Sequence, residues 1–187
     1  PEISYWSIRH SDALHVVSFL SAGFRTTALG GGLHRRVFAR HLARIDGRLA
    51  LSEHARRTYA PYVPGDCRII PSGVDIDRFR VPTRTPHDDA EGVRHMLFVG
   101  RLDRRKGLNV LLRSLPLLLR QVPRARLTVV GSGPGDTSAR ALARSLGIEE
   151  RVTFAGRVSR EALPAYYAAA DAYCSPALGG EPFGIVL

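Results

Sequence analysis

Lysine, cysteine and long hydrophobic runs are scarce in this sequence. Among its 27 Lys and Arg residues the one lysine is Lys106, in the segment VGRLDRRKG at residues 99–107. The two cysteines, Cys67 and Cys174, are far apart and lack the spacing of a metal site, which favours two buried thiols in a reducing compartment. No apolar run approaches the roughly 20 residues needed to span a bilayer, so the sequence predicts no transmembrane helix.

Apolar and basic residues are abundant instead. Apolar residues make up 44% and charged residues 24% of the 187 positions, which is typical of a globular protein. The formal net charge of +10 indicates an anionic partner such as a nucleotide, a phosphate, a nucleic acid or an acidic lipid, although a genome-wide arginine bias would give the same charge. The sequence starts at Pro1 and stops inside the apolar run PFGIVL, so we expect a fragment cut at both ends.

Short apolar runs alternate with helical patterns along the chain. Helical periodicity occurs at residues 108–122, 137–147 and 159–170, and strand-like runs occur at residues 15–20, 47–52, 67–73, 95–100, 126–131, 151–156 and 172–176. This alternation predicts an α/β fold with parallel sheets. The polar, proline-containing segment 81–94 interrupts it, so we expect two incomplete Rossmann-like domains, residues 1–80 and 95–187, joined by a linker.

The segment that contains Lys106 lies between a predicted strand and a predicted helix. In open parallel sheets, ligands bind at the carboxyl ends of the strands. The planar guanidinium of Arg101 and the compact ammonium of Lys106 suit the two sides of a diphosphate, and the N-terminus of the following helix adds positive potential. We therefore predict a diphosphate site here, with a solvated basic turn as the alternative.

The end of the chain, SPALGGEPFGIVL, shows a second anion-binding pattern. Backbone N–H groups of Phe183, Gly184 and Ile185 stand at a predicted helix N-terminus, where unpaired N–H groups hold phosphate or sugar oxygens. Glu181 is an acceptor beside this site, which fits the binding of sugar hydroxyls. Capping of the helix by Glu181 is the alternative.

Three of these motifs in this order, GRLDRRKG, RVTFAGRVS and SPALGGEPFGIVL, resemble the carboxyl-terminal domain of retaining glycosyltransferases of the family 4 type, which have the GT-B fold. The segment IIPSGVDIDRF is similar to that family's passage between its two domains. The LGGE-x-FGIVL ending is most similar to the actinobacterial phosphatidyl-myo-inositol mannosyltransferases and their relatives. The resemblance implies that residues 1–80 end an acceptor-side domain and that residues 95–187 begin a donor-binding domain.

The resemblance also implies roles for the motif residues. Arg101, Lys106 and the adjacent Arg105 would bind the donor diphosphate. Val158, with Ser159 and Arg160 beside it, would line the nucleoside pocket, largely through backbone groups. Glu181 would bind the donor sugar, with the backbone of residues 183–185 around sugar and phosphate. Arg101, Lys106 and Glu181 would carry catalysis, with neither a metal nor a cofactor.

The implied reaction transfers a hexosyl group, mannose by the nearest resemblance, from a GDP- or UDP-linked donor to a hydroxyl acceptor such as phosphatidylinositol, with retention of configuration. The sequence differs from the family's pattern at three points, and these differences predict that the chain by itself is inactive. Leu20 occupies the position of a histidine near the family's reaction centre, a second glutamate would fall beyond Leu187, and the first strand with its glycine-rich loop would precede Pro1.

Two further motifs have local interpretations. Asp75-Ile76-Asp77 matches the Asp-x-Asp pair of metal-dependent glycosyltransferases, but it follows a Pro-Ser-Gly turn, so turn formation and helix capping are the favoured explanation. GSGPG at residues 131–135 follows a strand as a dinucleotide-binding motif would. It lacks the third glycine and a suitable acidic residue, so we predict a strand-to-helix turn.

The segment 33–48, LHRRVFARHLARIDGR, predicts a basic helix that meets either anionic lipid or solvent. We expect a cytoplasmic protein, which a lipid contact would place peripherally on the inner face of the plasma membrane. The rival function is a nucleic-acid- or polyanion-binding domain. Basic residues interleaved with acids, and no aromatic–basic stripe, favour the absence of a nucleic-acid partner. GT-B epimerases and phosphorylases share the fold but not this Glu-x-Phe-Gly ending.

Overall fold

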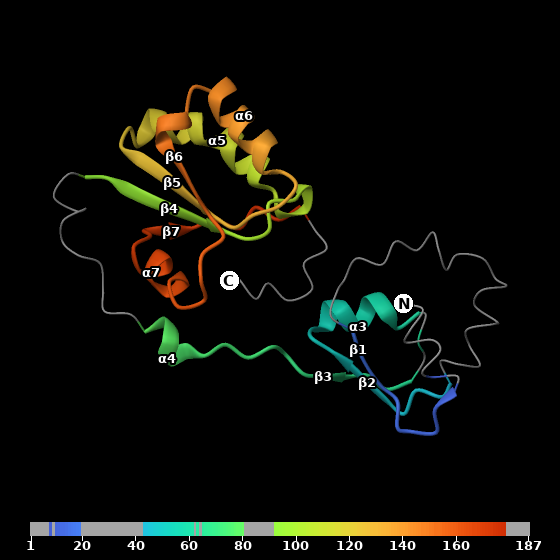
Figure 1. Ribbon diagram of the computed structural model, residues 1–187. Helices are drawn as coiled ribbons and strands as arrows, with labels where there is room; N and C mark the ends of the chain where they lie inside the picture. Colours follow the sequence, from blue (N-terminus) through green and yellow to red (C-terminus); the bar gives the residue numbers. More distant parts are fainter. Residues whose placement is uncertain are drawn as a thin grey trace. The chain divides into compact units, whose positions relative to one another are not determined.

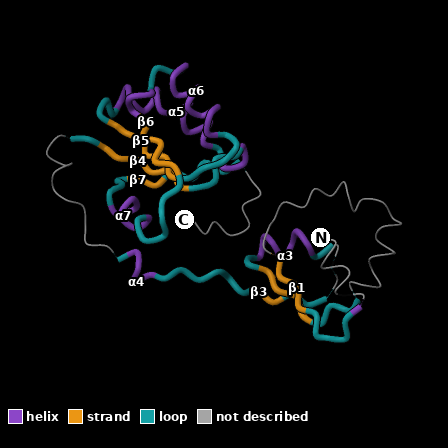
Figure 2. Tube along the Cα trace, in the orientation of Figure 1, coloured by secondary structure: helices purple, strands orange, loops and turns teal. Residues whose placement is uncertain are grey.

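Two parallel sheets organise the protein. The computed structural model describes residue 8 and residues 10–19, 43–61, 63, 65–80 and 92–178. This part of the chain forms two compact units, one within Pro1–Gly73 and one within Val74–Gly179, each built around its own sheet (Figure 1). The predicted α/β architecture is confirmed, and each of the predicted strand segments contains a strand (Figure 2).

The first unit has three parallel strands and a helix: β1 (Val16–Phe19), β2 (Gly47–Ala50), α3 (Glu53–Tyr59) and β3 (Arg68–Ile69). Strand β2 lies between β1 and β3. The side chain of Ser52 caps α3 by accepting a hydrogen bond from the N–H of Ala55. The ring of Phe19 stacks on the ring of Tyr59, with centroids 4.4 Å apart, so the end of β1 is packed against the last turn of α3.

The carboxyl end of the predicted basic helix at residues 33–48 is a strand. Gly47 and Arg48 begin β2 and pair with Val16 and Val17 of β1. Asp46 holds this register, because its carboxylate accepts from the N–H of His15 at 2.8 Å and its own N–H donates to the His15 carbonyl at 2.9 Å. The helical prediction is therefore wrong for these positions. Residues 33–42 lie outside the described residues.

The second unit contains the longer elements. They are α4 (Ile76–Phe79), β4 (Arg94–Val99), the 3-10 helix η2 (Arg104–Lys106), α5 (Leu108–Gln121), β5 (Ala125–Val130), α6 (Asp136–Ser145), the 3-10 helix η3 (Glu149–Arg151), β6 (Val152–Gly156), α7 (Leu163–Ala168) and β7 (Ala172–Tyr173).

Successive side chains of β4 enter two different cores. Because neighbouring strand residues point to opposite faces, Phe98 packs with the buried side of α5 and α6, whereas Leu97 and Val99 pack with α7. Of the apolar positions predicted for residues 108–122, α5 buries Leu108, Leu111, Leu112 and Leu115, with Leu112 fully inaccessible, whereas Leu118 and Leu119 are half-buried. Figure 1 shows α5 and α6 on one side of the sheet and α7 on the other. The sheet is covered on both faces, as predicted.

The order of strands in this sheet is β6-β5-β4-β7, all parallel. The chain moves outward from β4 to β6 and then returns to the other side of β4 to form β7. A reversal of this kind leaves a crevice at the carboxyl ends of the central strands, where ligands of open α/β sheets bind. The strand order therefore predicts a ligand site beside the loop after β4.

The second unit begins at Val74, ahead of the predicted linker at residues 81–94. The physical reason is that α4 is attached to α7. The Phe79 ring meets the Tyr167 ring edge to face, with centroids 5.7 Å apart, and the Arg78 guanidinium donates to the carbonyl oxygen of Arg160. Residues 81–91 lie outside the described residues. Within the described residues, no helix is both long and apolar enough to cross a membrane.

Candidate functional site

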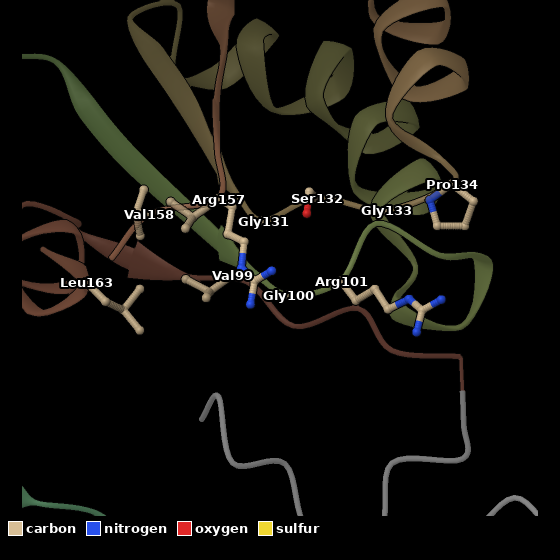
Figure 3. Close-up of a pocket in the computed structure, with 11 residues that line it drawn as sticks. Val99, Gly100, Arg101, Gly131, Ser132, Gly133, Pro134, Arg157, Val158 and Leu163 are labelled. Atoms are coloured by element: carbon tan, nitrogen blue, oxygen red, sulfur yellow. The ribbon is translucent and has the colours of Figure 1, made fainter. Parts of the chain in front are cut away.

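A cavity of about 560 Å³ opens at the carboxyl ends of β4, β5 and β6 (Figure 3). This volume lies within the range of about 300–1,000 Å³ found for small-molecule sites. Val158 and Leu163 stand at one side of it, and Arg101 and Pro134 at the other. The remaining lining comes from Val99, Gly100, Val130, Gly131, Ser132, Gly133 and Arg157. The cavity thus has an apolar side, a backbone-rich floor and two arginines.

The floor is formed by two loops that touch backbone to backbone. A Cβ atom on Gly131, whose φ is +133°, would lie 1.9 Å from the carbonyl oxygen of Gly100. A Cβ atom on Gly133 would lie 2.5 Å from the carbonyl oxygen of Leu102. The Leu102 N–H donates to the Ser132 carbonyl at 3.1 Å, which ties the loops together. The GSGPG segment is the predicted strand-to-helix turn between β5 and α6, and its glycines allow this close approach.

Asp103 shapes the loop that carries the predicted cations. Its carboxylate accepts hydrogen bonds from the backbone N–H groups of Arg105 at 3.0 Å and Lys106 at 3.3 Å, and so caps η2. Burial raises the pKa of the Asp103 carboxyl, but the hydrogen bonds from these two N–H groups outweigh burial, and the pKa lies below its ordinary value. The loop is thus held around a carboxylate that stays ionised.

The three cations predicted for the diphosphate do not lie equally close to the cavity. Arg101 lines it; its side chain is 68% exposed, with Nε 3.8 Å from a carboxylate oxygen of Asp103. Lys106 is half-buried, and its Cδ lies 3.8 Å from the position of a Cβ atom on Gly100, so its stem passes beside the cavity floor. Arg105 pairs with Asp103 at 3.5 Å and does not line the cavity.

The loop after β6 contributes Val158, as predicted, and also Arg157, which sequence reasoning missed. Arg157 directly follows Gly156, the last residue of β6. A basic residue just after a strand was the reason for predicting a role for Arg101, and the same reasoning applied to residue 157 would have found Arg157. Ser159 and Arg160 do not line the cavity. The Ser159 hydroxyl accepts from the N–H of Ala162 at 3.2 Å and so helps to begin the turn before α7.

The segment that follows β7 runs beside the loop of η2. The Cys174 N–H donates to the Leu97 carbonyl at 2.8 Å, and the Leu178 N–H donates to the Arg105 carbonyl at 2.8 Å. Between these two bonds, a Cβ atom on Gly107 would lie 1.9 Å from the Pro176 carbonyl oxygen. Gly107 has a φ of +73° and directly precedes α5, which begins at Leu108 as predicted. The described chain therefore ends next to the residues that carry the cations.

Five residues named from the sequence, Leu20, Glu181, Phe183, Gly184 and Ile185, lie outside the described residues. Their predicted roles stay predictions.

The Asp75-Ile76-Asp77 motif has the structural role that the sequence favoured. Asp75 caps α4 by accepting from the N–H of Arg78 at 3.3 Å, and Asp77 pairs with Arg80 at 2.8 Å. Within the part of the chain that the structure describes, no group of three or more His, Cys, Asp or Glu side chains is arranged to hold a metal ion.

Residues 82–187, more than half of the chain, match the family described as glycosyl transferases group 1. The chain belongs to this family. It is 39% identical over 145 residues to the phosphatidyl-myo-inositol mannosyltransferase of Mycobacterium tuberculosis, an alignment that covers 77% of this chain and 37% of the relative. The protein of the same name from Mycobacterium leprae is 31% identical over 188 aligned positions, which cover 100% of this chain and 49% of the relative.

The fold agrees with this family. The structure matches sucrose-phosphate synthase from Thermosynechococcus elongatus, a GT-B protein, with a TM-score of 0.73 and 25% identity over 97% of this chain and 49% of that one. The glycosyltransferase resemblance stated from the motifs is thereby confirmed, and the GT-B fold with it. The chain spans about half the length, or less, of the curated relatives that it matches.

Proposed function

We propose that this chain is part of a glycosyltransferase that moves a mannosyl group from a nucleotide-diphospho-sugar to a hydroxyl acceptor. The observation that carries the proposal is the cavity at the carboxyl ends of β4, β5 and β6, with Arg101 in its lining and Lys106 beside its floor. The family match supports the transfer of a glycosyl group, and the names of the mycobacterial relatives support mannose as the sugar.

The cations act on the leaving group. When the bond between the anomeric carbon and the diphosphate oxygen breaks, the electron pair stays on the diphosphate and its negative charge grows. The acceptor oxygen forms the new bond to the same carbon, and its proton passes to an oxygen of the departing diphosphate. Asp103 fixes the backbone of the loop that carries Arg101 and Lys106 before the donor arrives, so this loop need not refold for the two cations to stabilise the charge. Loss of one such group costs about 2–4 kcal/mol of transition-state stabilisation. The proposal needs no metal and expects retention of configuration.

Glu181 and the backbone of residues 183–185 complete the proposed donor site. Leu178, the last described residue, is bonded to the Arg105 carbonyl at 2.8 Å. Glu181 follows Leu178 by three positions in the sequence. We propose that its carboxylate binds hydroxyls of the donor sugar.

The proposed acceptor is an inositol phospholipid, by the names of the relatives. Such an acceptor lies in a membrane, and the basic residues of segment 33–48 suit anionic head groups. We therefore propose that the protein works peripherally on the inner face of the plasma membrane, and that nucleic acid is not a partner.

The test is donor binding to the whole protein, measured by isothermal calorimetry and thermal shift with GDP, GDP-mannose, UDP and UDP-glucose. We expect one nucleotide pair to bind and to raise the melting temperature. In Lys106→Ala, loss of a charge-assisted contact worth about 1.5–3 kcal/mol weakens that binding roughly ten- to a hundredfold.

The matched control is Arg113→Ala, which removes one positive charge from the exposed side of α5, outside the cavity lining. It should bind the donor as the wild type does. Full binding by Lys106→Ala would contradict the role of Lys106. Failure of the wild type to bind any of the four compounds would refute the proposed function.

A further inference from the structure

Gly100, at the end of β4, has basic residues from two different loops around it. Arg101 is its neighbour in the chain, and the stem of Lys106 lies 3.8 Å from the position that a Gly100 Cβ atom would take. Arg157 comes from a different loop, after β6, and Figure 3 shows its side chain directed across the cavity toward Gly100. Two loops thus place three basic residues in or beside one cavity.

Arg157 carries a charge that nothing in the described protein neutralises. Its side chain is exposed to the cavity, and among the described residues no carboxylate or carbonyl oxygen pairs with it. Arg101, by contrast, has Asp103 at 3.8 Å. Among the described residues that line the cavity, none is acidic. An arginine held in a cavity without an anionic neighbour favours an anionic ligand there.

We propose that Arg157 is a third cationic ligand of the donor diphosphate, in addition to Arg101 and Lys106. This inference rests on the proposed function and deepens it. The guanidinium fork donates two parallel hydrogen bonds to phosphate oxygens, which the single ammonium of Lys106 cannot do. Arg157 approaches the diphosphate from the β6 side and Lys106 from the β4 side, so the two enclose it from opposite loops.

The position of Arg157 favours a contact with the diphosphate over a contact with the nucleobase. The apolar side of the cavity, with Val158 and Leu163, suits a base, whereas Arg157 is directed toward Gly100. A phosphate contact therefore predicts the same loss for any ligand that contains a diphosphate, whichever base it carries. A base contact predicts a loss that depends on the base and is absent for inorganic pyrophosphate.

The experiment measures binding of GDP and UDP to the whole protein by calorimetry, and displacement of the tighter-binding nucleotide by inorganic pyrophosphate. We expect Arg157→Gln to weaken the nucleotide and pyrophosphate by a similar factor, about ten- to a hundredfold. Arg157→Lys keeps the charge but loses the fork, so it should recover part of the affinity. The matched control is Arg151→Gln, at the opposite end of β6, which should bind both ligands as the wild type does.

Each alternative result overturns the inference. Nucleotide affinity unchanged in Arg157→Gln shows that the side chain does not contact the ligand. A loss for the nucleotide without a loss for pyrophosphate assigns Arg157 to the base. A wild type that binds neither GDP nor UDP overturns the proposed function together with this inference, whereas the first two results leave the proposed function standing.

Discussion

Two glycines of the second unit have nearly the same positive φ but very different surroundings, so alanine substitutions at the two sites test the structure directly. Gly107 has a φ of +73° and Gly147 a φ of +66°. A Cβ atom on Gly147 would meet nothing within 4 Å, whereas a Cβ atom on Gly107 would lie 1.9 Å from the Pro176 carbonyl oxygen. An alanine at either site therefore pays the same cost for its positive φ, but only the alanine at position 107 also clashes with Pro176.

The expected magnitudes follow from these distances. Gly147→Ala should lower the free energy of unfolding by about 1–2 kcal/mol, the cost of a left-handed conformation for a residue with a Cβ atom. Gly107→Ala adds a displacement of about 1 Å between the start of α5 and Pro176, because Cβ atoms do not approach other atoms closer than 3.0 Å. Overpacking costs about 1–3 kcal/mol and the strained Leu178–Arg105 hydrogen bond about 1 kcal/mol more, so the total is about 3–6 kcal/mol.

The assay is urea-induced unfolding of both variants in the same whole protein, so that contributions from the rest of the molecule cancel in the difference. Because the displaced segment flanks the loop of Arg101 and Lys106, Gly107→Ala should also weaken donor binding, whereas Gly147→Ala should not. Equal destabilisation by the two alanines would show that Pro176 does not lie against Gly107, and the described path after β7 would then be wrong.

Three further predictions concern other groups. Because the pKa of Asp103 is lowered, its capping of η2 stabilises the fold fully above the ordinary carboxyl pKa of about 3.9, and this stabilisation is lost as the pH falls through the lower pKa of the folded state. Asp103→Ala should therefore lower the free energy of unfolding by about 1 kcal/mol at neutral pH and by less in acid. Urea unfolding at a series of pH values would show this difference. Burial, with a smaller effect of Tyr173, raises the pKa of Tyr167 to about 12. The unfolded phenol ionises near pH 10, so stability should fall between about pH 10 and pH 12, and absorbance titration should show one late-titrating tyrosine that Tyr167→Phe removes; its persistence in that variant would contradict the assignment. If segment 33–48 contacts lipid, neutralising Arg35, Arg36 and Arg40 should reduce sedimentation with anionic vesicles, and unchanged sedimentation would refute that contact.

Several elements were predictable because their signals are local. The apolar spacing of residues 108–122 predicted α5 and its buried side, and the helical periodicity of residues 137–147 predicted α6. The capping role of Asp75 was predictable from the turn that precedes it. In each case the cause lies within a few residues of its effect.

Other features depended on strands that are distant in sequence. Arg157 belongs to the cavity because β6 lies beside β5 in the sheet, and no local pattern states that order. The same is true of Gly131, whose need for a glycine comes from the carbonyl oxygen of Gly100 on the neighbouring strand. The predicted helix at residues 33–48 failed at Gly47 for this reason: pairing with β1 outweighed the helical pattern.

The amino-acid sequence by itself determined the succession of strands and helices, the parallel α/β class, the cations after β4 and the family. Hydrophobic periodicity, backbone preference and motif order all act over short distances along the chain. Only the tertiary structure decided which loops meet: that the glycines after β5 pack on the loop after β4, that the chain after β7 passes Gly107, and that Arg157 joins the cavity. These contacts depend on the order of the strands and on the close packing of backbone segments against each other. Both arise only once the sheet has formed.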